Sequence, residues 1–250
     1  MKSILIVKLS AMGDVIMASA LINAFKSAYP NARIVWLVQT GFEDLLNTHP
    51  SLDAVITWDK NAWKALWQQR RLGLLLREIM AMRKQLTGYQ FDQVIDIQGL
   101  LKSAFFALLS GARTRIGLGS KEGSQWLMNK VIAKIPDASR IGSEYLQLAQ
   151  SLNLPCDDFP MHIEITEDDY LFADKIINKE SIRDNYVIFC PFTTRPQKHW
   201  AAEHWRQLGD LIQQNYGYRA LVLGGPQDQS KAHDLCQHTQ LLSLAGTTRL

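Results

Sequence analysis

The opening residues of the chain predict a buried strand, a short loop and a helix, and this unit constrains the fold more than any other segment. Residues 4–7 are all aliphatic, which is typical of a parallel strand buried on both faces. Gly13 then permits a tight turn, and a helical pattern of apolar residues begins at Val15. In an open α/β sheet, the loop after the first strand is where ligands bind.

The same alternation of strand and helix continues through the first half of the chain. Strands separated by helical crossovers form a parallel sheet with helices on both faces, so the pattern predicts an α/β fold. The predicted strands cover residues 33–38, 54–58, 93–97 and 114–117, and the predicted helices cover residues 42–46, 61–86, 100–109 and 138–153, with Gly73 weakening the case for one unbroken helix over 61–86.

A polar, turn-rich stretch after Pro155 separates two predicted domains, residues 1–165 and 166–250. Thr166 precedes a run of acidic residues in the manner of a helix cap. Three strands are too few to complete a doubly wound sheet, so we expect the chain to be a fragment of a longer protein. The predicted strands of the second domain cover residues 186–191, 219–226 and 241–244, and its predicted helices after the capped one cover 202–214 and 228–238.

Composition argues against several classes of protein. A net charge of +3 is too weak to indicate nucleic-acid binding. The three cysteines are widely spaced without a Cys-x-x-Cys pair, which argues against a disulfide framework or a zinc site and suits a reducing cytosol. The first apolar run is too short for a signal peptide, and no run approaches the roughly 18 residues of a membrane span. The sequence has no G-x-G-x-x-G, Walker A or H-E-x-x-H motif, which disfavours dehydrogenases, P-loop enzymes and zinc proteases.

Two strand-end loops of the first domain carry side chains suited to chemistry. Lys8, Ser10 and Asp14 belong to the first loop, and the spacing leaves two interpretations of Asp14 open, a helix cap or a functional carboxylate. Asp96 ends an apolar run, so a carboxylate there needs partners or a function. The alternative is that Asp96 caps the next helix and that Lys102 is a solvated surface lysine.

A third strand-end loop, residues 193–200, has the chemistry to bind phosphate. Threonine hydroxyls and backbone N–H groups at a helix start are donors, and Lys198 adds a positive charge, although His199 can equally serve as a cap or a packing residue. Residues 60–71 interleave tryptophans with basic residues, a pattern that suits phosphorylated head groups or a membrane surface. A solvated basic helix face packed by its tryptophans is the alternative. We expect the three loops to face one cleft.

Three motifs follow one another along the chain: Lys8-x-Ser10-x-Met12-Gly13-Asp14, Asp96-x-Gln98-Gly99-Leu100-x-Lys102-Ser103 and Thr193-Thr194-Arg195-x-x-Lys198-His199-Trp200. Together they resemble the ADP-heptose:lipopolysaccharide heptosyltransferases, glycosyltransferase family 9, and most closely the heptosyltransferase I branch. The resemblance covers essentially the whole chain. It implies a GT-B fold of two Rossmann-like domains with parallel sheets, the acceptor bound by residues 1–165 and the nucleotide sugar by residues 166–250, a domain that is incomplete here.

The resemblance also implies a reaction and its residues. The reaction is the inverting, metal-independent transfer of heptose from ADP-L-glycero-D-manno-heptose to the Kdo-lipid A inner core of lipopolysaccharide. It takes place at the cytoplasmic face of the inner membrane, with peripheral membrane contact and without a cofactor or nucleic acid. Asp14 is the implied catalytic base. The implied donor-diphosphate residues are Thr193, Thr194 and Lys198, and the implied acceptor residues are Ser10, Gly13, Gln98 and Lys102, with Lys60, Lys64, Arg70 and Arg71 of the basic stretch.

The chain departs from the family pattern in two places. Arg140 and Glu144 stand where the family usually has a His and an Arg, which leaves the identity of the acceptor open. The family's Asp-x-Gly-x-x-His donor motif is absent from residues 1–250. Two alternatives therefore stay open at this point: a truncated paralogue that binds glycolipid without catalysis, and a GT-B enzyme that uses another nucleotide sugar.

Overall fold

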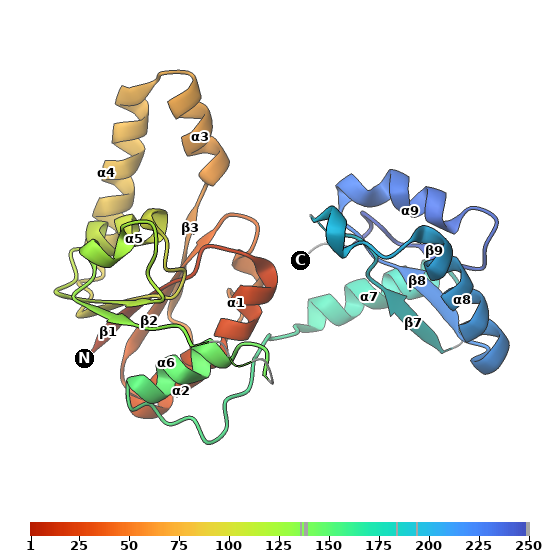
Figure 1. Ribbon diagram of the computed structural model, residues 1–250, viewed down its shortest axis with the longest axis horizontal. Coiled ribbons are helices and arrows are strands. Elements are labelled where there is room, and N and C mark those ends of the chain that lie inside the picture. The colour runs from red at the N-terminus through yellow and green to blue at the C-terminus, as the bar shows by residue number, and fades with distance from the viewer. Residues whose placement is uncertain (136, 138–139, 184, 194, 249–250) are drawn as a thin grey trace. The chain divides into compact units, whose positions relative to one another are not determined.

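The computed structural model describes residues 1–135, 137, 140–183, 185–193 and 195–248. The chain divides into two compact units, Met1–Ile165 and Thr166–Leu250. Each unit contains a parallel sheet with helices packed against it, so the predicted α/β class with two parallel sheets is confirmed (Figure 1). Within the described ranges, no helix is both long enough and apolar enough to cross a membrane.

The first unit is built on a six-stranded parallel sheet with the order β3-β2-β1-β4-β5-β6. The central strand β1 pairs with β2 on one side and β4 on the other, and Ile4 is opposite both Ile34 and Gln93. Because β1 and β4 are neighbours and parallel, the loops at their carboxyl ends lie side by side. The strands are β1 Ser3–Val7, β2 Arg33–Gln39, β3 Ala54–Trp58, β4 Gln93–Asp96, β5 Thr114–Leu118 and β6 Lys130–Ile132.

Both faces of this sheet are buried, which explains the uninterrupted aliphatic run of β1. Ile4 and Ile6 pack on one face against α1, α2 and α6, whereas Leu5 and Val7 pack on the other face against α4 and α5. All four side chains are fully buried. The helices of this unit are α1 Met12–Ala18, α2 Ala20–Ala28, α3 Lys60–Gln68, α4 Leu72–Gly88, α5 Leu101–Leu109 and α6 Ser143–Ser151.

Several element boundaries differ from the sequence-based expectation. The largely helical stretch expected over residues 61–86 is interrupted, as the doubt about one unbroken helix anticipated, and its two helices, α3 and α4, form a hairpin that projects from the sheet of the first unit (Figure 1). Its break lies at residues 69–71, where Arg70 has a φ of +57°, and Gly73 lies inside α4. The opening helix is also divided, at Ser19, whose hydroxyl donates to the Ile16 carbonyl and so competes with the helix ladder.

Three more elements differ from what the sequence predicts. The helix expected over residues 138–153 begins only at Ser143, after Gly142 with a φ of +75°; residues 138 and 139 lie outside the described part. Residues 42–46 contain a 3₁₀ helix, Glu43–Leu45, in place of an α-helix. Strand β6 was not predicted, because it has three residues of which two are exposed.

The second unit contains a three-stranded parallel sheet with the order β7-β8-β9. Helix α7 begins as predicted at Thr166, whose hydroxyl accepts a hydrogen bond from the Asp169 N–H at 3.3 Å. Phe189 and Val222 belong to the core between the sheet, α8 and α9. The elements are α7 Glu167–Lys179, β7 Tyr186–Phe189, α8 Ala202–Tyr216, β8 Arg219–Val222, α9 Gln229–Cys236 and β9 Leu242–Ser243.

Candidate functional site

The loops that follow β1 and β4 are joined by one side chain. Gln98 Oε1 accepts hydrogen bonds from the backbone N–H groups of Leu9 and Ser10, each at 3.1 Å. The carbonyl of Leu9 in turn accepts from the Gln39 N–H, which ties the β1 loop to the end of β2 as well. Gln98, predicted to bind the acceptor, therefore fixes the backbone of the loop that carries Ser10.

Asp96 lies beneath this junction and organises the β4 loop. Its Oδ1 accepts from the backbone N–H groups of Gln98 at 3.0 Å and Gly99 at 3.1 Å, and its Oδ2 accepts from the Ser103 hydroxyl at 2.9 Å. The residue is fully buried. Burial raises the pKa of Asp96 to about 6, although the hydrogen bonds from Gly99, Ser103 and Gln98 and the charge of Lys8 oppose the shift. The expectation that this carboxylate needs partners is confirmed.

Asp14 and Lys8 form an ion pair at the start of α1. Lys8 Nζ lies 3.2 Å from Asp14 Oδ2, and the Ala11 N–H donates to the same oxygen at 3.4 Å. Lys8 is 5% exposed, whereas the Asp14 side chain is 44% exposed. Asp14 is the third residue of α1, so it caps the helix and also pairs with a buried cation. Within the described residues, no hydrogen bond or ion pair involves Asp14 Oδ1.

Lys8 is held in a compact cluster of aromatic and charged groups. Its ammonium lies 5.9 Å from the centre of the Tyr145 ring. Burial lowers the pKa of Lys8; nearby Lys134 adds to this effect, and the carboxylates of Asp14 and Glu144 oppose it. Burial also raises the pKa of the Tyr145 hydroxyl, with further contributions from Asp14 and Glu144. These groups surround Lys8, which pairs with Asp14 Oδ2, while 44% of the Asp14 side chain stays exposed.

Glu144 belongs to the same cluster through Lys134. Their side chains form an ion pair at 2.6 Å. Burial would raise the pKa of Glu144, but the hydrogen bond and the charge from Lys134 outweigh it and lower the pKa. Arg140, the other departure from the family pattern, is exposed, and its backbone N–H donates to the Asp137 carbonyl.

The two other predicted residues of the first loop lie beside Asp14. Ser10 is half-buried in the loop, and Gly13 is an exposed residue in the first turn of α1. A Cβ built at Gly13 meets nothing within 4 Å, so the surface above this turn is open. Another molecule can therefore approach the backbone closely at this turn.

A groove of about 790 Å³ lies between the α3–α4 hairpin and the start of α5. Its walls are largely apolar and include Trp58 and Phe105, and its charged side chains are Lys60, Lys64, Lys102 and Glu122. Burial lowers the pKa of Lys102, the charge of Lys60 lowers it further, and Glu122 raises it. The groove therefore brings together three of the predicted acceptor residues, and its chemistry suits an anionic molecule with apolar parts.

The tryptophans of the basic stretch divide between packing and exposure. Trp63 makes edge contacts with Trp58 at 5.8 Å and packs on Phe106 at 5.7 Å, as the packing interpretation expects. Trp67 is 66% exposed and also borders the groove. Arg70 and Arg71 lie in the exposed turn between α3 and α4 and do not line the groove.

The phosphate-binding loop predicted in the second unit follows β7. Thr193 is half-buried, and its hydroxyl accepts from the Arg195 N–H at 3.4 Å. A His199 ring nitrogen lies 2.8 Å from the Thr193 carbonyl, so this histidine fixes the loop. Lys198 is exposed at the end of a short 3₁₀ helix, Pro196–Lys198. Thr194, also predicted to bind diphosphate, lies outside the described residues.

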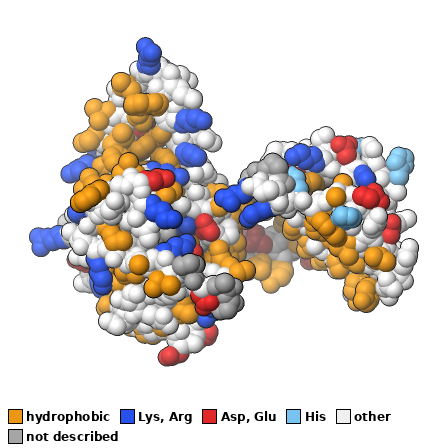
Figure 2. Space-filling view, in the orientation of Figure 1, with side chains coloured by type: hydrophobic (Ala, Val, Ile, Leu, Met, Phe, Trp, Pro, Cys, Tyr) orange, Lys and Arg blue, Asp and Glu red, His pale blue; other side chains and the backbone are white. Residues whose placement is uncertain are grey.

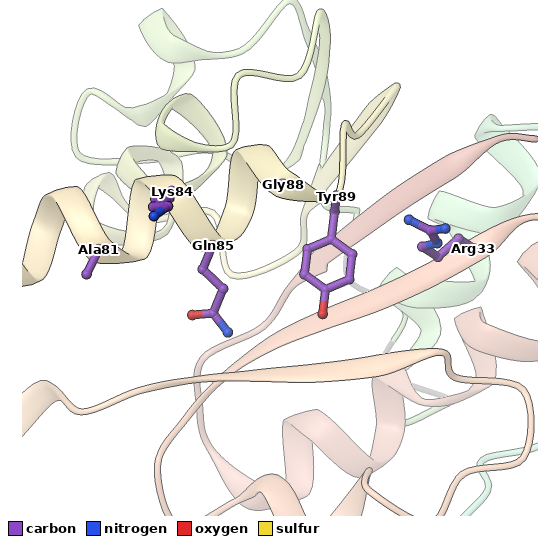
Figure 3. Close-up of a pocket in the computed structure, with 6 residues that line it drawn as sticks. All are labelled: Arg33, Ala81, Lys84, Gln85, Gly88 and Tyr89. Carbon is purple, nitrogen blue, oxygen red and sulfur yellow. The ribbon is translucent and has the colours of Figure 1, made fainter.

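A further hollow of about 520 Å³ lies beside the amino end of β2 in the first sheet (Figure 3). Arg33 begins β2 there, and Tyr89 follows the last residue of α4. Figure 3 shows the side chains of Gln85 and Tyr89 extending to the same side of this chain segment. The hollow lies at the amino ends of the strands, away from the loops that carry Asp14 and Gln98.

The whole chain is similar to known proteins. Residues 79–250 match the family model described as glycosyltransferase family 9 (heptosyltransferase). Lipopolysaccharide heptosyltransferase 1 of Escherichia coli K12 is 30% identical, over 99% of this chain and 78% of that protein. The structure of E. coli heptosyltransferase WaaC with ADP-2-deoxy-2-fluoro heptose is 25% identical, with a TM-score of 0.72, over 97% of this chain and 76% of that one. The structure of a family 9 glycosyltransferase from Veillonella parvula has a TM-score of 0.83 at 19% identity, over 99% of this chain and 71% of that one. At this identity the likeness shows a shared fold alone.

Proposed function

Because the chain belongs to glycosyltransferase family 9, the heptosyltransferases, we propose that it moves heptose from ADP-L-glycero-D-manno-heptose to the Kdo-lipid A inner core of lipopolysaccharide. The chain is a glycosyltransferase with the GT-B type of fold, and its relatives are enzymes of lipopolysaccharide core synthesis. The observation that carries the specific proposal is the Asp14 carboxylate, which is held by a buried lysine on Oδ2 while 44% of its side chain is exposed.

We assign Asp14 as the general base. Its Oδ1 takes the proton from an acceptor hydroxyl while that oxygen forms a bond to the anomeric carbon of heptose. The bond between the anomeric carbon and the diphosphate oxygen breaks in the same step, ADP leaves with the electron pair, and the anomeric configuration inverts. Lys8 and the Ala11 N–H hold Oδ2 and so keep the carboxylate oriented.

The acceptor is proposed to bind to the first unit. Lys60, Lys64 and Lys102 face one groove and match the negative charge of a Kdo-containing glycolipid. The β4 loop connects this groove to the Ser10 loop. Leu100 and Lys102, which follow the β4 loop, line the groove, and Gln98 of the same loop holds the backbone of Ser10. We include Ser10, Gly13 and Gln98 as residues beside the reacting hydroxyl, and Arg70 and Arg71 as more distant contacts with anionic groups.

The donor is proposed to bind to the second unit. The Thr193 hydroxyl and the Lys198 ammonium suit the diphosphate and offset the charge that develops as ADP leaves. Thr194 belongs to the same proposal from its place in the motif. We further propose that the enzyme works at the cytoplasmic face of the inner membrane in peripheral contact with it, because the acceptor is a membrane lipid.

The decisive experiment is Asp14→Asn, assayed for transfer of heptose from ADP-heptose to Kdo-lipid A. Loss of a positioned base lowers kcat by roughly 10²–10⁴-fold. Asp158→Asn, which changes an exposed carboxylate of the same unit, is the matched control and keeps the parent rate. Normal turnover by Asp14→Asn would remove Asp14 as the base. Faster transfer from UDP- or GDP-sugars than from ADP-heptose would contradict the donor assignment.

A further inference from the structure

Helix α4 carries an apolar stripe that neither the core nor the acceptor groove uses. Leu72, Leu76 and Met80 follow one another at four-residue intervals and therefore lie on one face of the helix. They are 54%, 59% and 54% exposed. The buried face of α4 is formed by other residues, Met82 and Leu86. The stripe is thus a solvent-facing surface of large apolar side chains.

The α3–α4 hairpin, residues 60–88, is also strongly basic. It has seven basic residues and one acidic residue, a net charge of +6 in a chain whose net charge is +3. Throughout the ranges that the structure describes, none of these seven takes part in a salt bridge. Figure 2 shows hydrophobic side chains gathered along the hairpin, with Lys and Arg at its tip and margins. The basic residues are Lys60, Lys64, Arg70, Arg71, Arg77, Arg83 and Lys84.

We infer that the outer face of the α3–α4 hairpin docks on the surface of an anionic phospholipid bilayer, with Leu72, Leu76 and Met80 in the interfacial layer and the arginines on the head groups. Apolar residues beside Lys and Arg on one helical surface are the combination that binds bilayer interfaces. The charge complementarity selects a negatively charged occupant, and it disfavours a second copy of this chain, whose hairpin carries the same +6. The inference rests on the proposed function, in which the acceptor is a membrane lipid, and it assigns the surface that meets the membrane.

The test is flotation of the protein with vesicles that contain no lipopolysaccharide. One set is pure phosphatidylcholine and the other includes phosphatidylglycerol. We expect binding only to the anionic vesicles, decreasing with salt. Leu76→Asp with Met80→Asp abolishes it, and Arg77→Ala with Arg83→Ala weakens it by about fivefold for each basic residue removed. Leu211→Asp, at an equally exposed leucine of α8, is the matched control and binds like the parent.

Heptose transfer to a water-soluble, deacylated acceptor is measured on the same variants, with circular dichroism as the check on folding. None of the four substituted hairpin residues lines the acceptor groove, so transfer is expected to stay at the parent rate. Equal binding of the neutral and anionic vesicles, or unchanged binding by the Leu76/Met80 variant, would overturn the inference and leave the proposed function standing. Vesicle binding without transfer by the parent protein would leave the surface assignment standing and overturn the proposed function. A dimer in vesicle-free solution that Leu76→Asp dissociates would show that a second copy covers this face.

Discussion

Asp96→Asn tests whether the buried carboxylate beneath the candidate site costs stability at neutral pH. Asp96 is fully buried, and burial raises its pKa from 3.8 to about 6. Asparagine has nearly the same shape and keeps an oxygen that can accept from the Gln98 and Gly99 N–H groups. Its amide NH₂ can donate to the Ser103 hydroxyl, whose proton can then turn to the Leu100 carbonyl oxygen 2.8 Å away. The substitution therefore removes the charge and retains the hydrogen bonds.

The sign of the effect follows from the direction of the pKa change. The folded protein holds the Asp96 proton more tightly than the unfolded chain does, so protonation stabilises the fold. This contribution is complete below pH 3.8, decreases as the pH rises toward 6, and is absent above that value. A pKa gap of about two corresponds to about 3 kcal/mol. Between pH 4 and pH 7, the free energy of unfolding of Asp96→Asn should therefore rise relative to that of the parent by about 2.5 kcal/mol.

The measurement is urea unfolding of both proteins at several pH values between 4 and 7, followed by circular dichroism and tryptophan fluorescence. Asp92→Asn is the matched control, because Asp92 is exposed just before the same strand and also accepts a backbone hydrogen bond, from the Ser3 N–H. It should show no gain of this size. A difference between Asp96→Asn and the parent that stays constant over this pH range would refute the reasoning.

Three further substitutions test other parts of the site. Lys8→Met removes the partner that orients the Asp14 carboxylate, so kcat should fall by about tenfold or more with KM little changed. Stability measured by urea unfolding should not fall, because the substitution removes a buried charge. Gly99→Ala should lower the free energy of unfolding by roughly 1–3 kcal/mol. Gly99 has a φ of +69°, and a Cβ there would lie 2.5 Å from the Leu118 carbonyl oxygen. Urea unfolding at the parent's midpoint would contradict this prediction. Lys102→Gln should raise the KM for the acceptor and not for the donor in steady-state kinetics.

The fold could be predicted where burial on both faces leaves a clear sequence pattern. The apolar runs of β1 and β2 predicted these strands correctly because central parallel strands are buried on both faces. Strand β6 has no such run, and its structure depends on pairing with β5, which a local pattern does not contain. The division at Ser19 likewise depends on a side-chain hydrogen bond that helical periodicity does not reveal.

The candidate site could be predicted only in part. The motifs located the loops, and the parallel order of β1 and β4 explains why two of them meet. The ion pair between Lys8 and Asp14 was not predicted, although a lysine directly after a fully buried strand is a signal that its charge needs a partner. The contribution of Glu144, Lys134 and Tyr145 to that cluster depends on segments far apart in the sequence, so only the folded chain brings them together.

The α3–α4 hairpin projects from the first unit (Figure 1) and is a separate segment of the chain from the loops that follow β1 and β4. The chain leaves the sheet after β3 and returns at β4, and among the described residues of α4 the buried ones are Met82 and Leu86, with Ile79 packed beside them. Substitutions or insertions near Arg70 can therefore accumulate without disturbing α1, which carries Asp14, or β4, which carries Asp96. If the proposed roles hold, the surface that meets the acceptor can therefore diverge among related proteins while the residues around Asp14 stay unchanged.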